Sequence, residues 1–145
     1  MKIVFLDLDG VLNTLQPHEH SGPWSKAACS NLNTLLHKSP DLRIVISSSH
    51  RKHGIAHCRK LLQDQGIDPI KVIDTLGPQE EIGKLDREEL IKEWLSQHLS
   101  VKDFVIFDDY FSMPKYKKHF VKTNSYVGLT GADVDKALVI LNGKP

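Results

Sequence analysis

Two aspartates follow a short apolar run near the N-terminus. The run, Ile3 to Leu6, is short and partly β-branched, which is typical of a buried strand, and Asp7-Leu8-Asp9-Gly10 comes directly after it. Because side chains alternate along a strand, carboxylates at i and i+2 point to the same side. Two such negative charges need a cation, and oxygen ligands suit a hard ion such as Mg²⁺. A turn that merely ends a strand would also use Asp and Gly, so the rest of the chain must decide.

Polar residues follow two further apolar runs. A serine triplet, Ser47 to Ser49, follows the second predicted strand, and Asp108-Asp109 follows the fourth. Arg87 lies at the start of the helix before that strand, and Lys84 lies shortly before it. Ligands of parallel sheets bind at the carboxyl ends of the strands, so these groups should converge on one edge. Carboxylates with Mg²⁺, hydroxyl groups and a cation make a phosphoryl-transfer site.

Each of these groups also has a structural explanation. The serines could cap the following helix, Arg87 could pair with a neighbouring glutamate on a solvated face, and Asp108-Asp109 could form a turn. Together with the turn at Asp7 and Asp9, this makes four separate coincidences in the order of one known kind of site. Four coincidences are less probable than a single site.

The elements that must position these groups alternate along the chain. Apolar runs predict strands at 3–6, 42–46, 70–73, 104–107 and 119–123. Helical patterns predict helices at 26–37 after the N-cap Ser25, at 55–65, at 134–141, and from the capping-box spacing Asp86-x-x-Glu89 through Leu95. Uniformly apolar strands between helices favour a parallel sheet covered on both faces. We therefore expect an α/β fold, a three-layer Rossmannoid sheet of about five strands.

Composition and length narrow the class of protein. A chain of 145 residues suits one domain, 1–145. A net charge of +1 gives no overall field toward nucleic acid or membrane. No apolar run approaches a membrane span, and the N-terminus leads directly into the first strand, without a signal peptide. Cys29 and Cys58 lack a CxxC spacing, so we expect no disulfide framework. A cytoplasmic location is the default, although an exported effector would look the same.

Several stretches together carry a family resemblance. DLDGVLN, the apolar run into Ser47, the basic residue at the next helix start and VIFDD match, in order, the four motifs of the haloacid dehalogenase-like (HAD) phosphatases. Arg87, Ile91, Trp94-Leu95 and the tail VKTNSYVGLTGADVDKALVIL are similar to a compact, capless HAD subgroup of RNA-repair fusion proteins. Many relatives have Trp before the basic residue after the serines, whereas this chain has His50-Arg51.

The resemblance implies a role for each acidic residue. Asp7 would be the nucleophile and form an aspartyl-phosphate. Asp9 would protonate the leaving oxygen and then activate water. Mg²⁺ would be held by the Asp7 carboxylate, the Asp9 backbone carbonyl and an acid from the fourth strand. We favour Asp109 as that acid, with Asp108 supporting it.

The resemblance also implies a phosphate-binding set. Ser47 would bind the phosphoryl group through its hydroxyl, with Ser48 as the alternative, beside Gly10. Arg87 would neutralise the phosphate and hold the nucleophile, with Lys84 as the alternative. The chain is thus expected to be a Mg²⁺-dependent phosphomonoester hydrolase for a phosphorylated substrate: a nucleotide, a nucleic-acid end or a small phosphoester. A HAD-type protein phosphatase, or a catalytically weak binding or switch module, is the alternative.

Three further features bear on the substrate. His50, His53 and His57 would fall on one helical face if the helix predicted at 55–65 starts earlier, but they match no zinc pattern, so exposed polar residues are the simpler interpretation. In HAD proteins the region of the loop with His18 and His20 forms a flap over the site, and larger relatives insert a cap domain there or before the third strand. Neither gap in this chain is long enough for a cap domain, so the resemblance implies an open site. The basic cluster from Lys115 to Lys122 could attract a polyanion such as nucleic acid, or could be a solvated surface. We expect a monomer that does not bind membranes.

Overall fold

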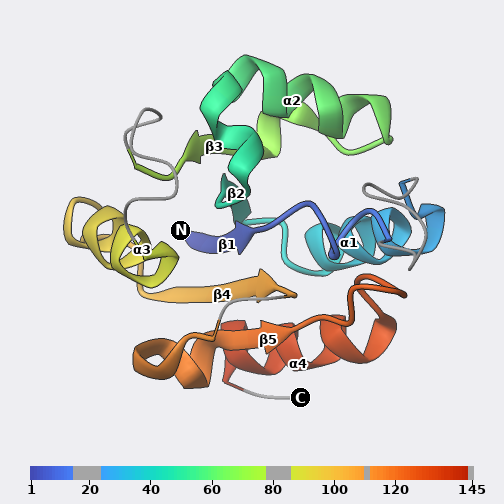
Figure 1. The fold of residues 1–145 in the computed structure, drawn as a ribbon. Coiled ribbons are helices and arrows are strands. Elements are labelled where there is room, and N and C mark those ends of the chain that lie inside the picture. The colour runs from blue at the N-terminus through green and yellow to red at the C-terminus, as the bar shows by residue number, and fades with distance from the viewer. Residues whose placement is uncertain (15–23, 78–85, 110–111, 144–145) are drawn as a thin grey trace.

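Five parallel strands form the centre of the molecule, in the order β3-β2-β1-β4-β5. The computed structural model describes residues 1–14, 24–77, 86–109 and 112–143. The strands are β1 (Lys2–Leu6), β2 (Leu42–Ile46), β3 (Val72–Thr75), β4 (Asp103–Asp108) and β5 (Phe120–Lys122). The arrows of β1, β4 and β5 point the same way in Figure 1. The predicted parallel α/β sheet is confirmed.

Helices cover both faces of this sheet. The α-helices are α1 (Lys26–Lys38), α2 (Ile55–Asp64), α3 (Arg87–Ser96) and α4 (Gly131–Asn142). The described residues also form the short 3₁₀ helices η1 (Ser49–His53), η2 (Pro69–Lys71) and η4 (Pro114–His119). Within the described residues, none of the helices is both long and apolar enough to cross a bilayer.

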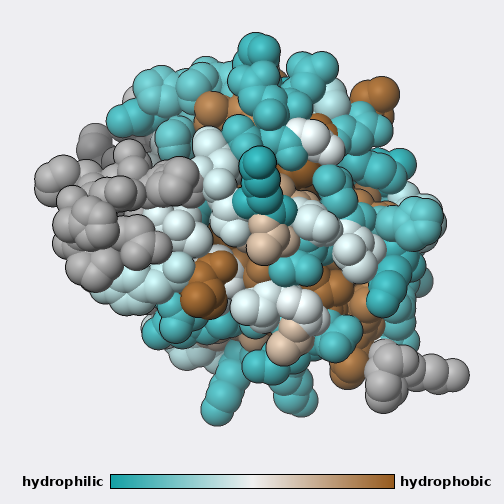
Figure 2. Space-filling model, turned by 90° about the vertical axis from the view of Figure 1, so that its right-hand side faces the viewer, coloured by the Kyte–Doolittle hydropathy of each residue, from teal (hydrophilic) through white to brown (hydrophobic). Residues whose placement is uncertain are grey.

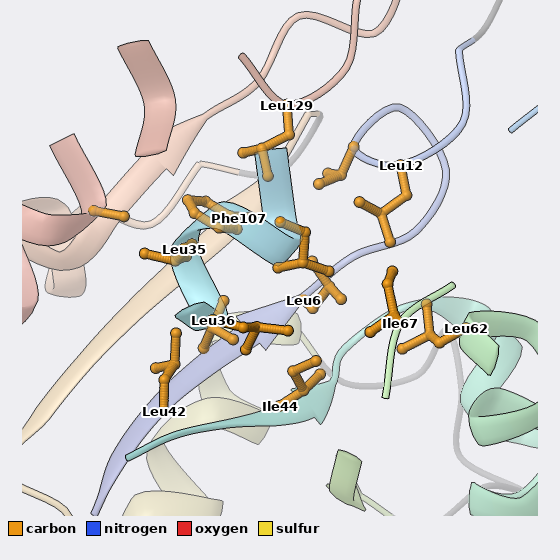
Figure 3. Close-up of a cluster of buried hydrophobic side chains, with 14 of the residues drawn as sticks. Leu6, Leu12, Leu35, Leu36, Leu42, Ile44, Leu62, Ile67, Phe107 and Leu129 are labelled. Atoms are coloured by element: carbon orange, nitrogen blue, oxygen red, sulfur yellow. The ribbon is translucent and has the colours of Figure 1, made fainter. Parts of the chain in front are cut away.

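Alternation along the strands divides the core into two layers. In β1, Val4 and Leu6 point into a cluster with apolar residues of α1, α2 and α4, whereas Ile3 and Phe5 point into a second cluster with α3. Figure 3 shows Leu6 of β1 between the α1 residues Leu35 and Leu36 and the α2 residue Leu62. Trp94 of α3 lies in the second layer, edge-on to the Phe5 ring. A sheet buried on both faces explains why its strands are apolar without alternation.

Several predicted helix ends are confirmed by their capping contacts. The Ser25 hydroxyl accepts a hydrogen bond from the Ala28 N–H and starts α1, and Asp86 accepts from the Glu88 N–H and starts α3. The last helix begins earlier than predicted, because Thr130 and Asp133 form a capping box. Such caps satisfy N–H groups that have no partner within the helix.

The third strand begins later than predicted. Asp68 accepts a hydrogen bond from the Ile70 N–H, and Pro69 begins the 3₁₀ turn η2, so β3 starts only at Val72. A proline has the fixed φ that suits the first position of a helical turn, which outweighs the strand preference of Ile70. The shift moves the strand along the chain but leaves its place beside β2 unchanged.

Candidate active site

The strand register brings three predicted site residues side by side. Leu6 pairs with Ile46 of β2 and with Phe107 of β4, so the next residue on each strand is Asp7, Ser47 or Asp108. The hydrogen bonds continue past the strands: the Asp7 N–H donates to the Phe107 carbonyl at 3.1 Å, and the Ser47 N–H donates to the Leu6 carbonyl at 2.9 Å. The three side chains therefore lie at the carboxyl ends of adjacent strands, where ligands of such sheets bind. Figure 2 views the molecule from the side toward which these strands point, a face with many hydrophilic residues.

Three carboxylates gather at this edge. One oxygen from each of Asp7, Asp108 and Asp109 lies within 4.8 Å of the others. Asp7 is 6% exposed and Asp108 is fully buried. Burial, followed by the Asp108 charge, raises the pKa of Asp7 to about 8, while Arg87 acts in the opposite direction and Asp109 adds to the rise. Buried like charges are unfavourable without a cation. Because all the donors are carboxylate oxygens, the group fits a hard divalent ion such as Mg²⁺.

Arg87 supplies a positive charge to this group. Its Nη1 atom lies 2.6 Å from Asp108 Oδ2 and 3.4 Å from Asp7 Oδ1. The residue is the first of α3, and this helix is fixed to the sheet by the Trp94 indole N–H, which donates to Asp74 Oδ2 of β3 at 2.7 Å. Arg87 therefore contacts both the proposed nucleophile and a strand-four acid. Lys84, the alternative cation, lies outside the described residues.

Gly10 makes room for Asp109. It has a φ of +81°, and a Cβ atom there would overlap the Asp109 carboxylate. Its N–H donates to Asn13 Oδ1 at 3.0 Å, and its carbonyl accepts from the Thr123 hydroxyl at 3.0 Å. The Ser125 hydroxyl donates to Asp109 Oδ2 at 2.9 Å. Two residues after β5 thus hold the turn that follows β1 and the Asp109 carboxylate.

The Asp9 side chain does not join that of Asp7, although the alternation of side chains along a strand predicts that it would. Its Oδ1 atom accepts a hydrogen bond from Asn13 Nδ2 at 2.8 Å and lies 3.8 Å from His50 Nε2. β1 ends at Leu6, so the i, i+2 rule does not extend to this residue. The carboxylates that join Asp7 are those of Asp108, the last residue of β4, and of Asp109, whereas the Asp9 side chain is 42% exposed.

The two candidate serines differ in their surroundings. The Ser48 hydroxyl caps η1 by accepting from the His50 N–H. Ser47 is fully buried, and its Oγ atom has no hydrogen-bond partner among the described residues. A buried hydroxyl without a partner costs free energy, which a bound phosphate oxygen would offset. Of the two, Ser47 is the one that is ready to bind a ligand.

Arg51 is the basic residue after the serines, and the sequence alone led us to assign it no role in the site. It is 3% exposed, and its Nη1 atom donates to the Ser47 carbonyl at 2.8 Å and to the Ser48 carbonyl at 3.3 Å. Its Nε atom is buried without a partner in the described structure. Burial and then the Arg87 charge lower the pKa of Arg51, whereas Asp7 acts in the other direction. The sequence shows a basic residue shortly after the serines, but only the structure shows that its side chain is turned inward.

A Rossmann-like parallel sheet, acids at the ends of two adjacent central strands and an arginine at the start of the preceding helix are the features expected of the HAD-type hydrolase class. Residues 3–134 match the family model described as the HAD domain in Swiss Army Knife RNA repair proteins, and the chain belongs to this family. The resemblance inferred from the sequence is confirmed at both levels. No curated protein and no solved structure matches the chain significantly.

Proposed function

We propose that the protein is a Mg²⁺-dependent phosphomonoester hydrolase in which Asp7 is the nucleophile. The observation that supports this most directly is the combination of groups around Asp7. Two acids and Arg87 lie against it, and the Ser47 hydroxyl and the Arg51 Nε–H are buried beside it without partners. Anion-binding donors next to a cation-binding group are the components of a phosphoryl-transfer site.

The nucleophilic step uses the Asp7 carboxylate. It attacks the phosphorus atom and forms an aspartyl-phosphate while the bond to the leaving oxygen breaks. Asp7 Oδ1 accepts a hydrogen bond from the Leu8 N–H at 2.9 Å, which holds the carboxylate in one orientation. Mg²⁺, held by Asp7, the Asp9 carbonyl and Asp109 with Asp108 in support, would supply positive charge to the phosphate and keep Asp7 ionised.

Two arginines and a serine would hold the phosphoryl group. Arg87 approaches Asp7 from α3, and Arg51 approaches from η1. Ser47 follows β2 directly, and its hydroxyl is buried without a partner among the described residues. Donors that are already in place gain strength as charge develops on the phosphoryl oxygens, because they need no reorganisation. Gly10 contributes space, since a side chain would displace Asp109.

Asp9 would carry the proton in both halves of the reaction. It donates a proton to the leaving oxygen in the first step and accepts one from water in the second. Asn13 holds its Oδ1 atom, so the other oxygen is left to exchange the proton. The exposure of Asp9 suits a group that meets the leaving group at the mouth of the site.

The substrate class is proposed from the family and from the open site. A domain found in RNA repair proteins would act on a nucleotide or on the phosphorylated end of a polynucleotide. The basic cluster from Lys115 to Lys122 adds little to this proposal. Its η4 part lies toward the start of β4, where the His119 Nδ1 atom contacts the Phe104 carbonyl, and only Lys122 is paired with Asp108 at the carboxyl end.

Hydrolysis of an aryl phosphate tests the reaction itself. We expect turnover that requires Mg²⁺, and we expect Asp7→Asn to reduce kcat by at least about 10³-fold, as for the loss of other enzymatic nucleophiles. Circular dichroism checks that the variant is folded. Turnover retained in Asp7→Asn, or no Mg²⁺-dependent turnover on any phosphoester, would contradict the proposal. Trapping with beryllium fluoride adds a second check, because a long-lived adduct without turnover indicates a phosphorylated switch.

A further inference from the structure

Three histidines form a ridge that leads outward from Asp9. His50 is closest, with Nε2 3.8 Å from Asp9 Oδ1. The His50 and His57 rings are stacked with their centroids 6.0 Å apart, and the His57 and His53 centroids are 4.8 Å apart. We call His50, His53 and His57 the histidine ridge. The proposed reaction assigns it no role.

The ridge is produced by a break between two helices. His50 and His53 belong to η1, and His57 lies in the first turn of α2. Gly54, with a φ of +91°, separates the two elements, so the chain changes direction and the rings come together. His53 is exposed, and His50 and His57 are partly exposed. Their imidazole groups are therefore available to a ligand from solvent.

The position of the ridge identifies what would meet it. In the proposed reaction Asp9 donates its proton to the leaving oxygen, so the leaving group must lie on the Asp9 side of the phosphate. The side chain next to Asp9 on that side is His50, and the other two rings extend away from it. This step rests on the proposed function, because it uses Asp9 as the acid.

The chemistry of the ridge favours an extended anion over a metal ion. Among the described residues, the ligand atoms close enough together for a single ion are those of the three carboxylates, not those of the imidazoles. Imidazole N–H groups donate hydrogen bonds to phosphate oxygens. Burial and then the His53 and His50 charges lower the pKa of His57, and an anion beside the rings would counter that mutual repulsion.

We propose that the histidine ridge is the leaving-group subsite and that it binds a second phosphate carried by the leaving group. The preferred substrate then has a terminal phosphomonoester for Asp7 and another phosphate a short distance away. A nucleoside bisphosphate and a phosphorylated oligonucleotide both have this chemistry. They differ in whether the second phosphate is a monoester or a diester.

Substrate pairs with and without the second phosphate test this subsite. We compare kcat/KM for an aryl phosphate, adenosine 3′- and 5′-monophosphates, adenosine 3′,5′-bisphosphate and trinucleotides with a 3′ or 5′ phosphate. The second phosphate is expected to raise kcat/KM roughly tenfold, the effect of a hydrogen bond to a charged group. A preference for the bisphosphate would show that the histidine ridge binds a phosphate monoester. A preference for the trinucleotides would show that it binds a phosphate diester.

Variants of the outer rings separate the subsite from the reaction. His53→Gln/His57→Gln should remove most of the preference, about fivefold or more, and leave hydrolysis of the aryl phosphate within about twofold, since neither residue contacts Asp9. His37→Gln is the matched control, because His37 is an exposed histidine in the last turn of α1, which leads to the amino end of β2. If the double variant and the control behave alike, or if the second phosphate has no effect in the wild type, the subsite is wrong.

A binding measurement keeps this outcome distinct from failure of the proposed function. Adenosine 3′,5′-bisphosphate is titrated into Asp7→Asn, and the imidazole proton resonances are followed by NMR. We expect the ridge resonances, assigned with His→Gln variants, to shift while that of His37 does not. Shifts without any aryl phosphate turnover would support the subsite and reject the hydrolase. Turnover without shifts would support the hydrolase and reject the subsite.

Discussion

Two ion pairs of equal length lie in different surroundings in this molecule. Arg87 and Asp108 are 2.6 Å apart at the carboxyl edge of the sheet, with side chains 11% and 0% exposed. Lys115 and Glu89 are also 2.6 Å apart, but their side chains are 56% and 47% exposed. Water screens the second pair and can replace either partner, whereas the first pair has given up its hydration.

The difference shows where the fold tolerates unfavourable electrostatics. Around Arg87 there are three acids, a second arginine and two buried polar atoms without partners. Around Lys115 the charges are exposed and compensated. A site that must bind both a cation and an anion keeps groups that only those ligands satisfy, and such strain is expected at functional sites. An ion pair of the same N···O distance is therefore a sign of a functional site at Arg87, but carries no such information at Lys115.

The largest effect should be on the pH dependence of stability in the metal-free protein. The pKa of Asp7 is about 8 in the folded protein against 3.8 in an ordinary environment, so between these values the folded state binds more protons than the unfolded state. Its free energy of unfolding should then fall as pH rises from about 4 to 8, by an amount of the order of 5 kcal/mol at the limit.

Urea denaturation across this pH range measures the trend. Asp7→Asn should flatten it, because an amide does not titrate. Mg²⁺ should stabilise the wild type more at pH 8 than at pH 5, since it binds the ionised carboxylates. If the free energy of unfolding of the wild type and of Asp7→Asn changed with pH in the same way, the raised pKa of Asp7 would not be the cause of the trend.

Removing the buried cation should have the next largest effect. Arg87→Met deprives Asp108 of a charge at 2.6 Å in a buried place, and breaking such a pair typically costs about 3 kcal/mol. Denaturant unfolding at pH 7 gives the change in free energy. Activity on an aryl phosphate should be lost in the same variant, because Arg87 also contacts Asp7. If Arg87→Met were as stable as the wild type, the buried Arg87–Asp108 pair would contribute no more to stability than the exposed Lys115–Glu89 pair.

Two glycines separate a backbone effect from a site effect. Gly10 and Gly66 have nearly the same φ, +81° and +82°, but a Cβ atom would overlap Asp109 only at Gly10, and it meets nothing within 4 Å at Gly66. Alanine at Gly66 should cost about 1 kcal/mol of stability, the usual penalty for this backbone region, and alanine at Gly10 should cost more, because Asp109 must also move. Only Gly10→Ala should also abolish stabilisation by Mg²⁺ in thermal unfolding. Equal responses to Mg²⁺ would argue against Asp109 as a ligand.

The exposed pair should give the smallest effect. Lys115→Met removes its cation, and we expect a free energy of unfolding and a kcat/KM on aryl phosphate within the error of each measurement, because the partners are solvated. Glu89 titrated by NMR should show the loss of Lys115, since that hydrogen bond and charge lower the pKa of Glu89. A large loss of stability in this variant would mean that the two pairs differ less than their exposure indicates.

The sheet and the positions of Asp7, Ser47 and Asp108 could be predicted from the sequence because both depend on local patterns. An apolar run predicts a strand, and parallel register then places the residues that follow each strand next to one another. The orientation of Asp9 could not be predicted, since it depends on β1 ending at Leu6. The burial of Arg51 could not be predicted either, because a short 3₁₀ helix turns it inward.

The supports of the site are also invisible to local patterns. The Thr123 hydroxyl binds the Gly10 carbonyl across 113 positions of the chain. No periodicity links two residues so far apart, and both Thr and Ser are common on surfaces. Motif matching therefore finds the groups that perform chemistry, whereas the residues that hold them in place become visible only in three dimensions.

These supports have a consequence for synthesis on the ribosome. Every proposed catalytic group from Asp7 to Asp109 is made before Thr123 and Ser125, which hold the Gly10 turn and the Asp109 carboxylate. The Leu129 N–H, which donates to the Val11 carbonyl at 2.8 Å, comes later still. A nascent chain that ends just after β4 would therefore contain all the motif residues and no assembled centre, so that activity would arise only as the last helix emerges.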